Sequence, residues 1–196
     1  MKKILSIVGA RPNFIKMAPI CKALQKYSSE VNHQLCHTGQ HYDAKMSKVF
    51  FDQLGMPTPN FYLGINGGSQ TDMTARIMQE FEKVVLAEEP DMILVPGDVN
   101  STLACSLVAS KLGIKIAHIE SGLRSFDRTM PEEINRIITD VIADLLFVTE
   151  QSGLDHLKDE GVDEKKIHLV GNVMIDSLVE LLPQIEQSTI IDNLSL

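Results

Sequence analysis

The sequence is poor in tryptophan, cysteine and positive charge, and each shortage excludes a class of function. It has no tryptophan, three cysteines, and 18 Lys and Arg residues against 26 Asp and Glu residues in 196. The formal net charge of −8 argues against general binding to nucleic acid or to an anionic membrane, because both depend on clustered cations. A small anionic ligand stays compatible with this charge, since a few local cations outweigh the overall sign.

The sequence also lacks metal-binding, targeting and dinucleotide signatures. Cys21, Cys36 and Cys105 form no CxxC and no Cys/His ligand set, which predicts buried reduced thiols, no metal centre and a cytoplasmic protein. The apolar run near the N-terminus stops at Gly9-Ala10, too early for a signal peptide, and no run is long enough to cross a membrane. A Rossmann dinucleotide site is not favoured, because no GxGxxG motif is present.

Short apolar runs alternate with helical segments along the whole chain. The seven predicted strands lie at 3–8, 33–38, 60–63, 92–96, 115–119, 145–148 and 167–170. This alternation predicts an α/β fold with a doubly wound, mostly parallel, Rossmann-like sheet. We expect one domain over residues 1–182, a last helix that ends at Pro183, and a tail or linker over residues 183–196.

Local signals predict the ends of two other helices. The helix before the strand at 92–96 should be capped by Ser69 or Thr71. The helix after that strand should be capped by Asn100, Ser101 or Thr102, with Gly113 at its C-terminal capping position.

Two strands in the middle of the sequence are each followed by a carboxylate. Asp98 follows the strand at 92–96 and Glu120 follows the strand at 115–119, with one predicted helix between them. Parallel strands end at the same edge of a sheet, and ligands of open α/β sheets bind there. The pair predicts an acid–base site, although Asp98 could instead be a helix cap. His118 lies inside the second apolar run and reads as a satisfied core histidine.

A third group of charges opens the helix that begins at Pro131. Glu132 and Glu133 occupy its first turn and Arg136 follows one turn later. Acidic residues in a first turn favour the helix dipole without any further role. However, these three residues follow the strand tips that carry Asp98 and Glu120, which favours the interpretation that they belong to the same site.

Two further segments carry candidate ligand-binding groups. Arg11 and Lys16 bracket the start of the first helix, where free N–H groups and the helix dipole favour a phosphate; surface charge is the equal alternative. Gln40 and His41 lie in a polar loop after the second strand. His41 could act as an acid or base, but a lone loop histidine is more often simply solvated.

Five motifs in this order resemble one known family. The segments GARPNFIKMAP, TGQH, VPGDVNSTLA, HIESGLRSFDRTMPEEINR and LVGNVMIDSL resemble the non-hydrolysing UDP-N-acetylglucosamine 2-epimerases of bacteria and archaea. The resemblance implies the first half of a glycosyltransferase-B-like architecture, in which the active site lies between two Rossmann-like domains. It implies interconversion of UDP-GlcNAc and UDP-ManNAc by proton abstraction at C2, with elimination and re-addition of UDP.

The resemblance also implies roles for individual residues. Asp98, Glu120 and Glu132 match the catalytic carboxylates, without an assignment of base and acid. The residues that match substrate-binding positions are Arg11, Lys16, Gln40, His41 and Arg136. No metal or other cofactor is implied, because the hydrogen moves as a proton. Family members often form homodimers through this domain, so we expect a homodimer here.

Two positions depart from the family pattern at a regulatory nucleotide-sugar site. Asp43 stands where a glutamine is expected and Ser69 where an arginine is expected, so we expect that site to be weak or absent. The second domain's motifs are missing, so the chain alone should bind UDP-GlcNAc weakly and have negligible turnover. The alternatives are a hydrolysing epimerase that releases UDP and ManNAc, a glycosyltransferase, and a non-catalytic nucleotide-sugar-binding domain.

Overall fold

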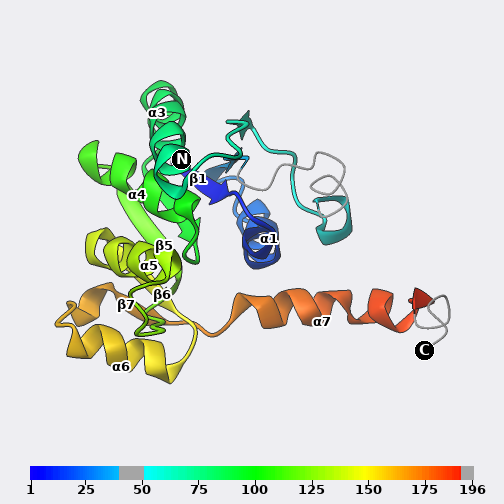
Figure 1. The fold of residues 1–196 in the computed structure, drawn as a ribbon. Coiled ribbons are helices and arrows are strands. Elements are labelled where there is room, and N and C mark those ends of the chain that lie inside the picture. The colour runs from blue at the N-terminus through cyan, green and yellow to red at the C-terminus, as the bar shows by residue number, and fades with distance from the viewer. Residues whose placement is uncertain (40–50, 191–196) are drawn as a thin grey trace.

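A single open sheet organises the chain. The computed structural model describes residues 1–39 and 51–190 (Figure 1). Seven strands pair in parallel throughout, in the order β3-β2-β1-β4-β5-β6-β7. The predicted doubly wound α/β fold is therefore confirmed. The strands are β1 (Lys2–Val8), β2 (Val31–His37), β3 (Phe61–Tyr62), β4 (Met92–Pro96), β5 (Lys115–Ser121), β6 (Leu145–Val148) and β7 (Ile167–Leu169).

Helices cover both faces of this sheet, as the burial of its central strands requires. In β1, Leu5 and Ile7 belong to one hydrophobic core, and the alternate residues Ile4 and Val8 pack in the other. The first core is closed by α3, α4 and α6, and the second by α1. The helices are α1 (Arg11–Gln25), α3 (Gln70–Glu88), α4 (Asn100–Lys111), α5 (Pro131–Ile142), α6 (Gln151–Asp159) and α7 (Val173–Glu186).

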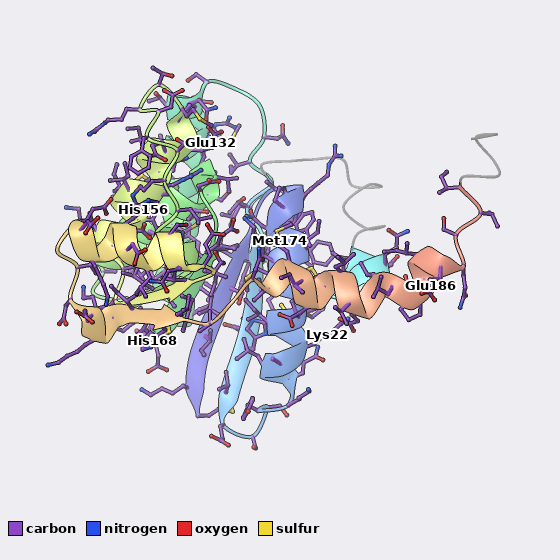
Figure 2. All side chains as sticks on the ribbon, turned by 90° about the horizontal axis from the view of Figure 1, so that it is seen from below. Lys22, Glu132, His156, His168, Met174 and Glu186 are labelled. Atoms are coloured by element: carbon purple, nitrogen blue, oxygen red, sulfur yellow. The ribbon has the colours of Figure 1, made fainter. Side chains whose placement is uncertain are left out.

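The last helix, α7, packs across α1 on the second face of the sheet (Figure 1). Figure 2 shows it extending past α1, with Met174 at its start and Glu186 at its end. The Ser177 hydroxyl donates to the Ile15 carbonyl at 2.6 Å, and Lys22 pairs with Glu180 at 2.5 Å. These contacts fix α7 on α1 close to the loop that leaves β7.

Two predicted helix ends are confirmed. Ser69 caps α3, because its hydroxyl accepts from the Asp72 N–H at 3.1 Å. Gly113 follows α4 with φ +70°, the left-handed conformation that a glycine adopts without strain.

Two other predicted helix ends are wrong. None of Asn100, Ser101 and Thr102 caps α4; the N-cap is Val99, with no side-chain cap. The Thr102 hydroxyl instead donates to the Pro96 carbonyl at 2.8 Å, so a contact with the sheet replaces local capping. The last helix continues through Pro183 to Glu186. Proline removes one helical donor there, but the helix is exposed and water can bind the freed carbonyl.

The described residues include no helix that is both long and apolar enough to cross a membrane. All three cysteines are buried and unpaired, as predicted.

Candidate functional site

The candidate site lies at the carboxyl edge of the sheet, and the turn after β1 forms its floor. Asn13 is buried and accepts with Oδ1 from the N–H groups of Gly9 and Ala10, at 3.2 and 3.1 Å. Its Nδ2 donates to the Pro96 carbonyl at 3.1 Å. Asn13 therefore fixes the start of α1 against the tip of β4. Sequence reasoning missed it, although an Asn three residues after a strand-ending Gly-Ala is a recognisable capping signal.

Lys16 forms an ion pair with Glu120 across the site. The ammonium contacts Glu120 Oε2, and the two side chains are 10% and 20% exposed. The structure thus brings together two predicted site residues, one from α1 after β1 and one from the end of β5, across the tip of β4. It also excludes the surface-charge reading for Lys16. Arg11, by contrast, is exposed, and the structure gives it no ion pair with the described residues.

Glu120 has an unusual backbone that directs its side chain. Its φ is +68°, and the pairing of β5 with β6 slips by one residue between Ile119 and Ser121. Such an irregularity at a strand end re-aims one side chain. A non-glycine residue with positive φ is strained and persists only where its surroundings hold it. The fold therefore imposes this conformation on Glu120.

Asp98 has a cation partner of its own. Its Oδ2 contacts Nη2 of Arg136, and its carbonyl accepts from Asn135 Nδ2 at 2.8 Å. The Asp98 side chain is 29% exposed and that of Arg136 is 16% exposed. Arg136 Nε is buried and has no hydrogen-bond partner among the described residues. Asp98 is thus no helix cap, since the N-cap of α4 is Val99.

The two acids that open α5 have different environments. Glu133 is 1% exposed and accepts from the N–H groups of Ser125 and Phe126, at 3.0 Å each. Burial would raise the pKa of Glu133, but these N–H groups and Arg136 hold it below its usual value. Glu133 therefore anchors the loop after β5. Glu132 is only half-buried and lies one helical turn before Arg136, on the same face.

A buried charged group that the sequence analysis missed lies behind these carboxylates. Asp140 of α5 is 2% exposed and contacts His118 of β5, whose Nδ1 lies 2.6 Å from Asp140 Oδ1. The prediction that His118 is a satisfied core histidine is confirmed. No local signal marked Asp140, because at helical spacing it lies off the apolar face that Ile134, Ile138 and Val141 form.

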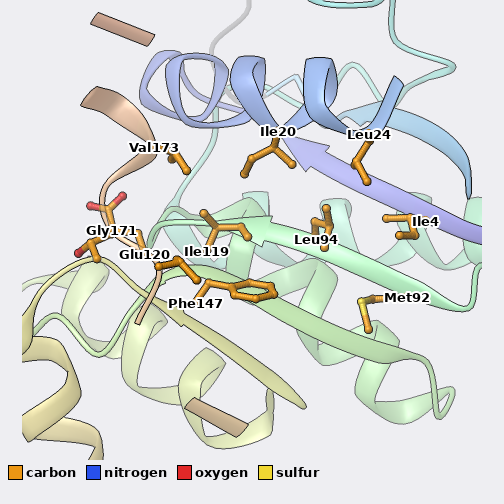
Figure 3. Close-up of a pocket in the computed structure, with 12 residues that line it drawn as sticks. Ile4, Ile20, Leu24, Met92, Leu94, Ile119, Glu120, Phe147, Gly171 and Val173 are labelled. Carbon is orange, nitrogen blue, oxygen red and sulfur yellow. The ribbon is translucent and has the colours of Figure 1, made fainter. Parts of the chain in front are cut away.

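An apolar cavity of about 370 Å³ adjoins Glu120 (Figure 3). It lies over the sheet between α1 and the start of α7. Apart from Glu120 and Thr149, its lining is almost wholly apolar: Ile4, Ile20, Leu24, Met92, Leu94, Ile119, Phe147, Val170, Gly171 and Val173. This lining does not suit a diphosphate. The charged groups Lys16, Asp98 and Arg136 therefore mark the polar part of the site at the strand tips.

The remaining predicted site residues are not placed. Gln40, His41 and Asp43 lie outside the described residues. Within the described residues, no three His, Cys, Asp or Glu side chains are arranged to hold a metal ion.

Comparison with known proteins identifies the family. The family described as UDP-N-acetylglucosamine 2-epimerase matches residues 22–195. A UDP-N-acetylglucosamine 2-epimerase homolog of Methanococcus maripaludis is 50% identical over 196 residues, which are 99% of this chain and 54% of the relative. A UDP-2,3-diacetamido-2,3-dideoxy-D-glucuronate 2-epimerase of Pseudomonas aeruginosa is 54% identical over 179 residues, which are 89% of this chain and 50% of the relative.

A solved structure agrees with these relatives. The UDP-GlcNAc 2-epimerase of Methanocaldococcus jannaschii, in complex with UDP-GlcNAc and UDP, superposes with a TM-score of 0.92 at 43% identity. The match covers 98% of this chain and 52% of that protein. The chain thus spans about half the length of the relatives it matches. On this evidence the chain belongs to the UDP-N-acetylglucosamine 2-epimerase family.

Proposed function

We propose that this chain provides the sugar-binding half of the active site of a UDP-GlcNAc 2-epimerase, which interconverts UDP-GlcNAc and UDP-ManNAc. The observation that supports this most is the pairing of Glu120 with Lys16 and of Asp98 with Arg136 at adjacent strand tips. Two carboxylates, each with its own cation, supply both proton transfer and charge stabilisation in one place.

The reaction explains why the site needs these residue types. The C2 proton is weakly acidic, so a positioned carboxylate must accept it while the bond from C1 to the diphosphate oxygen breaks. Negative charge then develops on the departing UDP, and Lys16, Arg136 and Arg11 are the cations that stabilise it. Elimination leaves a C1=C2 double bond, so inversion requires a proton to return to the opposite face of C2 while the diphosphate oxygen of UDP adds again to C1. Asp98, Glu120 and Glu132 are the candidates for these acid and base roles.

A second substrate has specific support. The Pseudomonas aeruginosa relative acts, by its name, on UDP-2,3-diacetamido-2,3-dideoxy-D-glucuronate, and its identity to this chain is 54%. The same C2 chemistry applies to both sugars, so the choice depends on contacts at C3 and C6. UDP-GlcNAc is favoured because the family and the matched complex are both described with it.

The proposal is tested by following hydrogen exchange at C2. Residues 1–196 would be fused to the second half of the Methanocaldococcus jannaschii relative, and UDP-GlcNAc would be followed by proton NMR in D₂O. Deuterium at C2 together with UDP-ManNAc is the expected result. Free ManNAc and UDP would select the hydrolysing reaction instead. Absence of exchange while the nucleotide is bound would overturn the proposal and favour a binding domain.

Single substitutions then assign the carboxylates. Asp98→Asn, Glu120→Gln and Glu132→Gln should each lower kcat by about 100-fold or more, since proton transfer by a positioned group contributes about 10²- to 10⁴-fold. Glu82→Gln is the matched control, because Glu82 is an exposed acid on the distant helix α3. Its kcat should equal that of the unsubstituted protein.

We also infer the setting in which this activity operates. The chain alone should bind UDP-GlcNAc weakly and have negligible turnover, because it is half the length of its relatives. Three buried free thiols fit a reducing compartment, so we expect a cytoplasmic enzyme that supplies an activated amino sugar for cell-surface polysaccharide. Exposed apolar side chains such as Leu86 and Val141, on α3 and α5, are consistent with a homodimer through this domain. Sedimentation of the purified chain tests that state.

A further inference from the structure

The buried carboxylate of Asp140 forms hydrogen bonds with residues on both sides of Glu120. Asp140 Oδ1 accepts from His118 Nδ1 at 2.6 Å. Asp140 Oδ2 accepts from the Gly122 N–H at 3.1 Å and from Arg124 Nη1 at 2.7 Å. His118 precedes Glu120 by two residues and Gly122 follows it by two. Asp140 therefore holds both ends of the short segment in which Glu120 has φ +68°.

The same network continues to the tip that carries Asp98. His118 Nε2 lies 2.7 Å from the Gly97 carbonyl oxygen. That oxygen can only accept, so the ring donates to it. Gly97 has φ +64° and immediately precedes Asp98. The His118 ring thus links Asp140 to the tip of β4, and the Gly122 N–H links Asp140 to the tip of β5.

The network is complete and almost wholly buried. Both ring nitrogens of His118 lie within hydrogen-bond distance of an oxygen, Nδ1 of Asp140 Oδ1 and Nε2 of the Gly97 carbonyl. Arg124 extends the hydrogen-bond network to Glu160. Its Nε and Nη2 donate to the two carboxylate oxygens of Glu160 at 2.8 and 2.7 Å. Burial alone would raise the pKa of Asp140, but His118 and Arg124 lower it below its ordinary value. A fully satisfied buried network of this kind is rigid.

We propose that Asp140 is a positioning residue that sets Asp98 and Glu120 in their reactive geometry, through His118 and the Gly122 N–H. The proposal rests on the proposed epimerase function. A purely structural role would stabilise the fold without affecting these two carboxylates in particular. The difference is measurable, because a displacement of about 1 Å at a reacting group costs about 100-fold in rate.

The geometric part of the test uses the chain itself. Amide chemical shifts would be compared between the unsubstituted chain and Asp140→Asn, which keeps the shape and removes the charge. Apart from Gly122, whose N–H donates directly to Asp140, we expect the largest shifts at Gly97, Asp98 and Glu120. Leu157→Ala, a core substitution in α6, is the matched control and should leave these three amides in place. Unchanged amides in folded Asp140→Asn would overturn the proposal.

The kinetic part uses the fusion protein and two substitutions of the linking ring. Glutamine at position 118 can place its Nε2 near the Gly97 carbonyl, whereas asparagine reaches only towards Asp140. Each variant breaks the link from Asp140 to the Gly97 carbonyl at one end, so both should lower kcat at least 10-fold, with KM within about threefold. Full kcat in either variant, or kcat that only follows their Tm, would overturn the proposal.

Failure of this proposal is distinguishable from failure of the proposed function. If the unsubstituted fusion protein does not exchange hydrogen at C2, the epimerase assignment fails, while the amide shifts of the chain still report on the geometry. If it does exchange and Asp140→Asn retains full kcat, the assignment stands and the positioning role is wrong.

Discussion

Replacement of His37 by leucine should remove a large part of the protein's acid sensitivity. His37 ends β2 and is 1% exposed, and neither ring nitrogen has a hydrogen-bond partner among the described residues. Its ring stacks on Tyr62 with centroids 4.8 Å apart and contacts Phe14 at 5.4 Å. Burial lowers the pKa of His37 from 6.5 to about 4, because the charged form cannot be solvated there.

The sign and size of the effect follow from linkage between protonation and folding. Below pH 6.5 the unfolded chain binds a proton at His37, whereas the folded chain binds it only when the pH falls to about 4. Stability is therefore full above pH 6.5 and falls as the pH falls. At 1.36 kcal/mol per unit, the loss is about 1.4 kcal/mol at pH 5.5 and about 3 kcal/mol at pH 4.

The assay is urea unfolding of the parent chain and of His37→Leu at several pH values between 4 and 7.5. As the pH falls, the unfolding free energy of the variant minus that of the parent should rise by these amounts. Carboxylate titrations occur in both proteins and cancel in this difference. Leu169→Ala is the control: Leu169 is exposed and has no titratable group, so its difference from the parent should not vary with pH. A difference for His37→Leu that is constant over this range would refute the reasoning.

Three further substitutions test local features of the fold by urea unfolding. Gly9→Ala should destabilise by about 1–3 kcal/mol, since a Cβ would collide with the paired hydroxyls of Thr38 and Ser101; an unchanged midpoint would contradict this close approach. Ser69→Ala should cost about 1 kcal/mol by removing the α3 cap, and Ser69→Asp should restore it. Glu133→Gln should cost about 1–3 kcal/mol and speed proteolysis of the loop after β5, and resistance equal to the parent would argue against the anchor.

The sequence by itself determined the architecture and the edge at which the candidate site lies. Apolar runs of strand length, separated by helical segments, are a local signal, and right-handed crossovers leave few topologies for them. Asp98 and Glu120 could be placed together because parallel strands must end at one edge. The role of Ser69 was also readable, since a helix cap depends on residues only three apart.

Local reasoning failed where a distant contact competed with a local one. Thr102 was a reasonable cap for α4, but its hydroxyl is taken by the Pro96 carbonyl. Pro183 was expected to end the last helix, yet α7 continues to Glu186. In each case the sequence shows the local preference and not the tertiary partner or the solvent that outweighs it.

The tertiary structure alone decided which charges pair and which are buried. Lys16 pairs with Glu120, and Arg136 pairs with Asp98, across more than 30 residues of sequence in each case. The positive φ of Glu120 likewise depends on groups that surround it from other elements. Charge pairing and desolvation are properties of three-dimensional proximity, which residue spacing along one helix or strand does not encode. For that reason the sequence identified the carboxylates, and only the fold showed that Asp140 lies behind them.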